Sequence, residues 1–457
     1  MYSLVVCTND SNGIGKDGKI PWRCPEDMAF FKNLTEDHVV IMGRKTWQSL
    51  SKKLDHRINI VLTRSPALLT DNSPDYAFSN MDSLLVFCEK KRKTEFKKKI
   101  FFVIGGNTVY RQFLERKLIH KIYWNIVEGS HECDTFFSNP NEFSKWEIAE
   151  YVKKPWGAMK YLTYENLEEE NFLVTLKKVM VNGIERKDRT GVGTKSIFGA
   201  DLRFNLAQSF PLLTTRPLPL RIIFEELMWI LRGQTDVSIL EEKNINIWTP
   251  NSTKEFIEKQ KLPYDAGDIG PSYGWQMRHF GAKYVNCKTN KGSGTDQLAY
   301  VIDLIKNNPT SRRILISLWN PAQIAEMTLP PCVWSYQFYV TPGNEEMPGK
   351  LSCKVIQRSS DISLAGGWNI ASGALFTHML AKICGLNVGE LIWSPADVHI
   401  YLNQMDAVKE QLSRKPYPFP QISLKFPTNG DILNFKWSDI SLLGYKTHPR
   451  IKLAMNA

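Results

Sequence analysis

The sequence predicts two domains, the first of them an α/β domain, and three observations support this organisation. A chain of 457 residues exceeds the roughly 250–300 residues that one hydrophobic core organises. Over residues 1–164, short apolar runs alternate with helix-like stretches, as in a sheet packed against helices. From Asn171 an amphipathic helix begins, with Phe172, Leu176 and Val179 on one face.

Each element of the first domain is predicted from an apolar run or a helical period. The expected strands cover residues 2–7, 39–42, 58–63, 100–104, 121–126 and 161–164. The expected helices cover residues 26–34, 45–50 and 107–114. The helix from Asn171 should end at Asn182-Gly183, since glycine commonly follows a helix. No Pro/Gly/Ser-rich linker follows the acidic stretch 165–170, so we expect domains at 1–166 and 167–457.

Composition and charge restrict the class of protein. No stretch approaches the roughly 18–20 apolar residues that span a bilayer. The chain starts without a basic leader or a small-residue cleavage site, so we expect a cytoplasmic protein. None of the eight cysteines lies in a C-x-x-C pair, and we expect neither a metal site nor a disulfide framework. The net charge of +11 favours anionic partners, and the basic run 90–99 is interpreted as a solvated helix and loop.

The first candidate site centres on Asp27, near the start of a predicted helix. Phe30, Phe31 and Leu34 follow it by three, four and seven residues, so Asp27 shares the apolar face, whereas Glu26 points elsewhere. A carboxylate beside aromatic rings is costly unless it meets a partner. Asp27 is therefore a candidate for ligand binding, and a solvent-facing helix cap is the alternative.

Glycines stand at two predicted strand-to-helix junctions, Gly105-Gly106 and Gly43. Without Cβ atoms, such junctions let phosphates approach the free N–H groups of a helix start. Gly105-Gly106 by itself is also compatible with a tight turn, and the G-x-G-x-x-G fingerprint is absent. Cations in Arg44-Lys45-Thr46 and Thr63-Arg64-Ser65 suit an additional phosphate, which favours NADPH over NADH.

In this order, the motifs of residues 1–165 resemble dihydrofolate reductase. The matching segments are Gly13-Ile14-Gly15-Lys16-Asp17-Gly18, Pro21-Trp22, Pro25-Glu26-Asp27, Val40-Ile41-Met42-Gly43-Arg44, Arg57-Ile58-Asn59, Val103-Ile104-Gly105-Gly106 and Cys133-Asp134-Thr135-Phe136-Phe137. The resemblance implies a mixed sheet with flanking helices and NADPH-dependent reduction of dihydrofolate.

The resemblance also implies roles for individual residues. Asp27 would anchor the pterin ring and support its protonation, with Thr135 behind the carboxylate. Trp22 would hold a bridging water, Phe31 would pack on the folate, and Arg57 would pair with the folate's glutamate carboxylate. The implied NADPH site consists of glycine, basic, hydroxyl and apolar residues: Ile14, Gly15, Gly43, Arg44, Lys45, Thr46, Thr63, Arg64, Ser65, Gly105, Gly106 and Tyr110.

The second candidate site centres on Cys332, directly after Pro330-Pro331. The segment Gln357-Arg358-Ser359-Ser360-Asp361 supplies a cation, hydroxyls and a carboxylate. A thiolate nucleophile needs positive charge nearby, and arginine also binds phosphate. Arg189 and Arg312-Arg313 are further candidate phosphate ligands, although adjacent arginines on a strand point to opposite faces. A structural cysteine and solvated arginines are the alternative.

From about Asn171 to the C-terminus, the chain looks like thymidylate synthase, which implies an α+β domain. The matching segments are Asp188-Arg189-Thr190-Gly191, Phe210-Pro211-Leu212-Leu213-Thr214-Thr215, Glu226-Leu227-Met228-Trp229, Gly267-Asp268-Ile269-Gly270-Pro271, Pro330-Pro331-Cys332, Gln357-Arg358-Ser359-Ser360-Asp361, Asn369-Ile370-Ala371-Ser372 and Asp397-Val398-His399-Ile400-Tyr401. The implied reaction is reductive methylation of dUMP with 5,10-methylenetetrahydrofolate as co-substrate.

In that reaction Cys332 would add to carbon 6 of dUMP and make carbon 5 nucleophilic. The phosphate would be held by Arg189, Arg358 and Ser359, and by Arg312 and Arg313 of a second subunit, which implies a homodimer. The resemblance also implies that Asn369 and the backbone at Asp361 bind the base and that His399 and Tyr401 bind the ribose. Glu226 and Tyr273 would take part in proton transfer, and Trp248 would line the folate site.

Five positions depart from the family pattern: Val333, Ala365, Trp368, Met277 and Ala396. They affect substrate affinity more than the type of reaction. We therefore expect a bifunctional dihydrofolate reductase–thymidylate synthase, a coherent pairing because the second reaction produces the substrate of the first. One alternative is a basic RNA-binding regulatory protein that keeps both folds. Another is a chain in which the first half alone is active.

Overall fold

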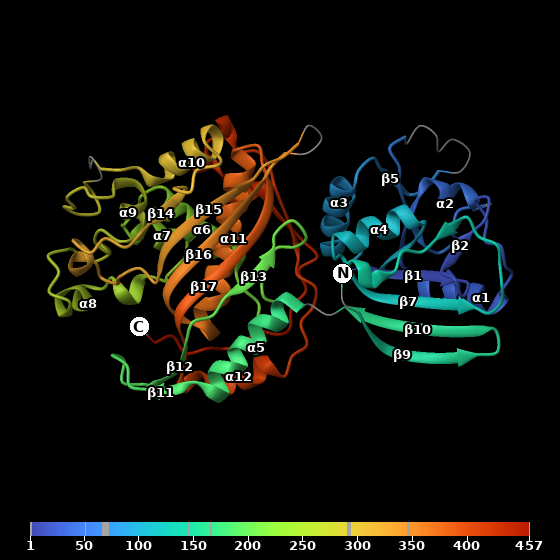
Figure 1. Cartoon of the computed structure of the whole chain (residues 1–457), viewed down its shortest axis with the longest axis horizontal. Coiled ribbons are helices and arrows are strands. Elements are labelled where there is room, and N and C mark those ends of the chain that lie inside the picture. The colour runs from blue at the N-terminus through green and yellow to red at the C-terminus, as the bar shows by residue number, and fades with distance from the viewer. Residues whose placement is uncertain are drawn as a thin grey trace. The chain divides into compact units, whose positions relative to one another are not determined.

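The computed structural model describes residues 2–50, 52–65, 73–144, 146–164, 167–289, 294–344 and 348–456. The chain divides into two compact units, which Figure 1 shows. The first unit comprises Met1–Leu167, Pro416–Ile422 and Ser441–Lys446, and the second comprises the remainder. The first unit thus contains residues from beyond the expected boundary. Leu443 is buried in its core, and the Gln421 side chain donates to the Arg116 carbonyl at 2.8 Å.

The first unit is built on an eight-stranded mixed sheet with strand order β5-β4-β3-β6-β1-β7-β10-β9. Pairing is parallel from β5 to β7 and antiparallel at β10 and β9. Its strands are β1 (Tyr2–Thr8), β3 (Val39–Gly43), β4 (Ile58–Leu62), β5 (Tyr76–Phe78), β6 (Phe101–Gly105), β7 (Ile119–Val127), β9 (Trp146–Lys154) and β10 (Gly157–Tyr164). Its helices are α1 (Pro25–Thr35), α2 (Arg44–Ser49), α3 (Met81–Lys93) and α4 (Asn107–Glu115), and β2 (Gly13–Gly15) pairs with β8 (Thr135–Phe136).

The central strands form because they bury both faces, as parallel strands do. Residues 39–42 of β3 are all fully buried. The expected mixed sheet with flanking helices is confirmed, with most element ends within a few residues. The expected set lacked helix α3, capped by the Asn80 side chain, and edge strand β9, whose polar and apolar residues alternate. It also lacked the short strands β2, β5 and β8. The basic run 90–99 contains the end of α3 and the turn before β6.

The second unit has a seven-stranded sheet with order β11-β12-β17-β16-β15-β14, to which β13 adds by pairing with β17. Its strands are β11 (Ile184–Arg186), β12 (Thr194–Phe198), β13 (Leu202–Asn205), β14 (Leu315–Ser317), β15 (Val333–Thr341), β16 (Lys350–Asp361) and β17 (Asn387–Tyr401). Its helices are α5 (Leu167–Asn182), α6 (Leu220–Leu231), α7 (Ser238–Glu241), α8 (Lys254–Lys259), α9 (Tyr273–His279), α10 (Gln297–Asn307), α11 (Gly367–Ile383) and α12 (Met405–Leu412). Two late strands, β18 (Gln421–Leu424) and β19 (Ile440–Leu443), pair with each other.

The apolar helix α11 packs directly on β16 and β17. Close approach depends on Gly373, because a Cβ there would lie 2.6 Å from the Val355 side chain of β16. Residues Ile362–Gly366 connect the end of β16 directly to the start of α11, so these two ends lie in the same part of the unit.

Helix α5 starts at Leu167, earlier than the expected Asn171, because three acids in its first turn suit the positive end of a helix. One of them, Glu169, is fully buried. It accepts the backbone N–H of Thr214 at 2.9 Å and of Thr215 at 2.8 Å, together with both threonine hydroxyls. Burial raises the pKa of Glu169 from 4.5 to about 6, and these hydrogen bonds oppose the rise.

We predict that Glu169 makes the stability of the second unit depend on pH. A pKa raised on folding contributes stability that is full below 4.5 and lost as pH rises through about 6. The unfolding free energy of the wild type, relative to Glu169→Gln, should therefore be about 2 kcal/mol larger at pH 4.5 than at pH 7.5. Calorimetry of both proteins at the two pH values measures the difference, and Glu170→Gln controls for the loss of one first-turn acid. An equal difference at both pH values would contradict the prediction.

Candidate active sites

The first site forms where α1 faces β7. The Asp27 carboxylate accepts a hydrogen bond from the Asn125 side chain, Nδ2 to Oδ1, at 2.7 Å. Burial raises the pKa of Asp27, and hydrogen bonds from Asn125 and Cys7 oppose that rise. Glu26, by contrast, is exposed, as its helical position predicts.

The expected partner of Asp27 was Thr135, and the structure corrects this assignment. Thr135 is exposed on β8, and its hydroxyl donates to Asp134 Oδ1 at 2.8 Å. Asn125 is instead the amide that reaches Asp27, and it is buried within β7. The sequence signal for Asn125 was that it is the single amide inside the apolar strand Ile119–Val127, because a buried polar group requires a partner.

A cleft of about 520 Å³ opens beside Asp27. It is lined by Ile20, Trp22, Arg23, Cys24, Pro25 and Met28. Near this helix, the Arg57 guanidinium carbon lies 5.9 Å from the centre of the Phe31 ring. Arg57 also donates to the Thr35 hydroxyl at 3.2 Å and the Asp55 carbonyl at 3.0 Å, which orients its planar donors. The structure thus brings Arg57 and Phe31 together.

The two glycine junctions lie side by side, since a Cβ on Gly43 would come within 3.9 Å of the Gly105 carbonyl and the Gly106 nitrogen. Gly105 has φ +139° and a Cβ there would touch the Thr46 side chain. Neither α2 nor α4 has a side-chain cap, so the N–H groups at their starts remain available to a ligand. These donors fit the phosphates of a dinucleotide.

The other residues expected at the cofactor divide into exposed and buried side chains. Lys45, Arg64 and Ser65 are exposed, and Arg44 lies against Gln48 at 3.3 Å. Thr63 is buried and its hydroxyl accepts the Ser65 N–H. Ile14 packs against the core, and Gly15 lies in β2. Tyr110 is also buried, and its hydroxyl donates to the Val5 carbonyl at 2.7 Å, so the structure uses this hydroxyl to join α4 to β1.

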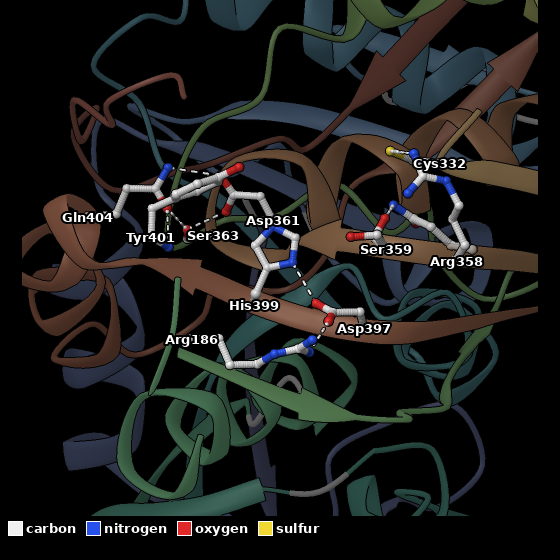
Figure 2. Close-up of polar contacts among 11 residues, drawn as sticks. Arg186, Cys332, Arg358, Ser359, Asp361, Ser363, Asp397, His399, Tyr401 and Gln404 are labelled. Carbon is white, nitrogen blue, oxygen red and sulfur yellow. Dashed lines mark hydrogen bonds and ion pairs between the residues drawn. The ribbon is translucent and has the colours of Figure 1, made fainter. Parts of the chain in front are cut away.

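The second site forms around Cys332, which precedes β15. Figure 2 shows the Arg358 guanidinium directed at this thiol, with Nη2 3.7 Å from Sγ. Arg358 also donates to the carbonyls of Pro330 and Pro331, each at 2.9 Å, so the cation is fixed on the segment that carries Cys332. Burial raises the pKa of Cys332, whereas the charges of Arg358 and Arg189 lower it.

Tyr273 contacts Cys332, and the carboxylate of Glu226 in turn influences Tyr273. The Tyr273 hydroxyl accepts the Cys332 backbone N–H at 2.7 Å. Glu226, on α6, accepts one indole N–H on each oxygen, from Trp248 at 2.8 Å and from Trp368 at 2.7 Å. Burial raises the pKa of Glu226, and both indole hydrogen bonds oppose the rise.

Strand pairing aligns the remaining residues of this site. In the parallel pair β16–β17, Ser359 is opposite Asp397 and Asp361 is opposite His399. The His399 ring contacts Asp397 at 2.9 Å, and Arg186 pairs with the same carboxylate at 3.1 Å (Figure 2).

The Asp361 carboxylate is occupied by other residues of the chain. Its oxygens accept from the Ser363 hydroxyl at 2.7 Å and from Gln404 Nε2 at 2.9 Å (Figure 2). Tyr401 lies at the end of β17, opposite Thr194 of β12, and its backbone N–H donates to Gln404. Asn369 lies in the first turn of α11. The sequence motifs did not single out Gln404, a buried residue that fixes the loop after β16.

Arg312 and Arg313 stand apart from the Cys332 cluster within this chain. Both are exposed, just before β14. Leu315 pairs with Gln337 and Ser317 with Ser335, so this register carries the two arginines toward the end of β15 that is opposite to Cys332. Of the departures from the family pattern, Val333 and Met277 are buried, and Ala365 lies in the short π-helix Ile362–Gly366 before α11.

Among the described residues, no group of three His, Cys, Asp or Glu side chains is arranged to hold a metal ion. In the same parts of the chain, every helix is too short or too polar to cross a membrane.

We predict that the Arg358 charge sustains the reactivity of Cys332. Arg358→Gln removes a charge that lowers the pKa of the thiol, so the thiolate fraction at pH 7.5 should fall. Alkylation of Cys332 by iodoacetamide, followed by peptide mass spectrometry, should slow about threefold to tenfold. Arg358→Lys keeps the charge and should recover most of the rate. Equal slowing in both variants would show that the cation is not the cause.

Comparison with known proteins assigns the two halves of the chain to two families. The thymidylate synthase family model matches residues 170–457, and the dihydrofolate reductase family model matches residues 1–167. A bifunctional dihydrofolate reductase-thymidylate synthase of Paramecium tetraurelia is 38% identical over 99% of this chain and 98% of that relative. Proteins of the same name from Zea mays and Plasmodium berghei are 36% and 34% identical, each over 99% of this chain and 96% of the relative. The chain therefore belongs to the family of bifunctional dihydrofolate reductase–thymidylate synthases.

Proposed function

We propose that Asp27 and Cys332 are the catalytic centres of the two reactions of this family. The chain is a multifunctional enzyme, an oxidoreductase and a methyltransferase of one-carbon metabolism. It reduces dihydrofolate to tetrahydrofolate with NADPH, and it methylates dUMP to dTMP with 5,10-methylenetetrahydrofolate. The RNA-binding alternative finds no support among these relatives, whose names state the two enzyme activities.

For the reductase reaction, we propose that Asp27 binds the pterin ring and assists its protonation. The Asn125 amide holds the carboxylate from behind, and the cleft beside it accepts the ring. Arg57, oriented over Phe31, suits the folate carboxylate. When bound, NADPH supplies the hydride. The helix starts at Gly43 and Gly106 are the proposed phosphate donors, together with Thr46, the half-buried Arg44 and the exposed cations Lys45 and Arg64.

For the synthase reaction, we propose that the Cys332 thiolate attacks carbon 6 of dUMP. The single observation that carries this assignment is the 3.7 Å approach of Arg358 to the thiol, which supplies the positive charge that a thiolate needs. Tyr273 is proposed to assist removal of the carbon 5 proton, and Glu226 to organise waters for proton transfer. Trp248 is proposed to line the folate site.

The same cation suits the nucleotide phosphate. We propose that Arg189, Arg358 and Ser359 bind this phosphate and that Asn369, the Asp361 backbone, His399 and Tyr401 bind the base and ribose. The Asp361 carboxylate already accepts from Ser363 and Gln404, which supports the backbone, and not the side chain, as the part of Asp361 that binds the base.

We further propose a homodimer formed by the thymidylate synthase part, in which Arg312 and Arg313 reach the phosphate of the other subunit. Their exposure at the far end of the β14–β15 pair supports this arrangement. We also propose that the boundary between the two domains lies near residues 166–167 and that the protein is cytoplasmic.

The assignment of Cys332 is tested by separating the two activities. With dUMP, methylenetetrahydrofolate and NADPH, the wild type should form dihydrofolate and then consume NADPH. Cys332→Ser should abolish dihydrofolate formation, because serine is a far weaker nucleophile. The same variant should oxidise NADPH at the wild-type rate when dihydrofolate is added. Dihydrofolate formation by Cys332→Ser would refute the assignment.

The assignment of Asn125 is tested against the discarded partner Thr135. Asn125→Ala removes a hydrogen bond to a carboxylate, so kcat/KM for dihydrofolate should fall about tenfold to a hundredfold. The pKa of Asp27 should rise, since the lost bond opposes the effect of burial. Thr135→Ala should change kcat/KM by less than twofold. Steady-state rates between pH 5 and 9 provide both readouts, and a larger loss in Thr135→Ala would reverse our correction.

A further inference from the structure

Trp368 stands out because it departs from the family pattern and donates its indole N–H to a candidate catalytic carboxylate. The acceptor is Glu226 Oε2, at 2.7 Å, across 142 residues of sequence. The other oxygen, Oε1, is held by Trp248 at 2.8 Å. We call Trp248, Trp368 and Glu226 the indole clamp. An indole N–H is only a donor, so both contacts require Glu226 to accept on each oxygen.

The backbone before Trp368 explains how its ring reaches this position. A Cβ on Gly367 would lie 2.4 Å from the Leu213 side chain, so only glycine lets the start of α11 approach this closely. The preceding turn is held by Arg216, which donates to the Leu364 carbonyl at 3.0 Å. The contacts of Leu364 and Gly367 therefore fix the segment that departs from the family pattern, directly before Trp368.

The groups that face Glu226 come from other elements. Tyr273 of α9 and Tyr336 of β15 both feel the Glu226 charge, and Tyr273 also feels Cys332. Burial raises the pKa of each of these three groups, so they remain protonated in the acidic range. On α6 itself, the neighbouring Glu225 pairs with Lys243 at 2.6 Å. Of Glu226, Tyr273, Tyr336 and Cys332, Glu226 is therefore the one whose charge changes in the acidic range.

We infer that Trp368 is a positioning residue for the synthase reaction: its N–H keeps Glu226 ionised and oriented near Tyr273. The inference rests on the proposed role of Glu226 in proton transfer. Protonation of Glu226 weakens the bonds that it accepts, and these charge-assisted bonds in turn favour the ionised form. The clamp thereby sets the lowest pH at which the synthase site works.

The test replaces the N–H without removing the aromatic ring. Trp368→Phe deletes the donor, and Trp368→3-benzothienylalanine deletes it while preserving the shape of the indole. In both variants, the acidic limb of the kcat–pH profile for dTMP formation should move about one unit toward higher pH. The KM for dUMP should stay within twofold. The reductase rate with added dihydrofolate, measured in the same samples, serves as an internal control.

Two further variants keep the result interpretable. Trp248→Phe removes the other donor and should move the limb in the same direction, so the inference stays testable if Trp368→Phe does not fold. Trp393→Phe removes an indole bond to the neutral Gln357, at 2.9 Å, and should lower the melting temperature without moving the limb.

An unchanged kcat–pH profile in the Trp368→3-benzothienylalanine protein would overturn the inference, because the shape of the ring without its N–H would then be enough to position Glu226. A higher KM for methylenetetrahydrofolate with an unmoved limb would also overturn it and would assign Trp368 to folate packing. A wild type that forms no dTMP would refute the proposed function itself, which is a separate outcome.

Discussion

A carboxylate or thiol that leaves water must find partners, and this constraint organises both units of the chain. Asp27 is met by Asn125, Glu226 by two indoles, and Glu169 by two consecutive threonines. In each case the partners are distant in sequence. The hydrogen bonds therefore do two things, because they hold a reactive or buried acid and also join one element of a unit to another.

The synthase site depends equally on strand register. Parallel pairing of β16 with β17 puts Ser359 opposite Asp397 and Asp361 opposite His399. A shift of one residue would turn every one of these side chains to the other face of the sheet. The close contact of α11 at Gly373 opposes such a shift, since the helix fits β16 only where the glycine faces Val355. Packing in the core thus maintains the geometry of the proposed nucleotide site.

The local pattern of apolar and polar residues predicted most of the fold, but it missed elements that are stabilised by strand pairing. The buried strands β1, β3 and β6 were predicted nearly to the residue, because continuous apolar runs identify strands covered on both faces. Strand β9 was missed, since its alternating polar residues resemble a loop until β10 pairs with it. Helix α5 began early because the acidic stretch, which looks like a linker in the sequence, stabilises a helix start.

The sequence alone pointed to the proposed reacting groups, because the motifs around Asp27 and Cys332 resemble those of the two families. Only the tertiary structure decided which residues support them. Asn125 lies 98 residues from Asp27, and Trp368 lies 142 residues from Glu226. Such partners are selected by the direction in which a packed strand or helix presents its side chain. Thr135 belongs to one of the matching motifs and was therefore expected to contact Asp27, but Asn125 of β7 makes this contact.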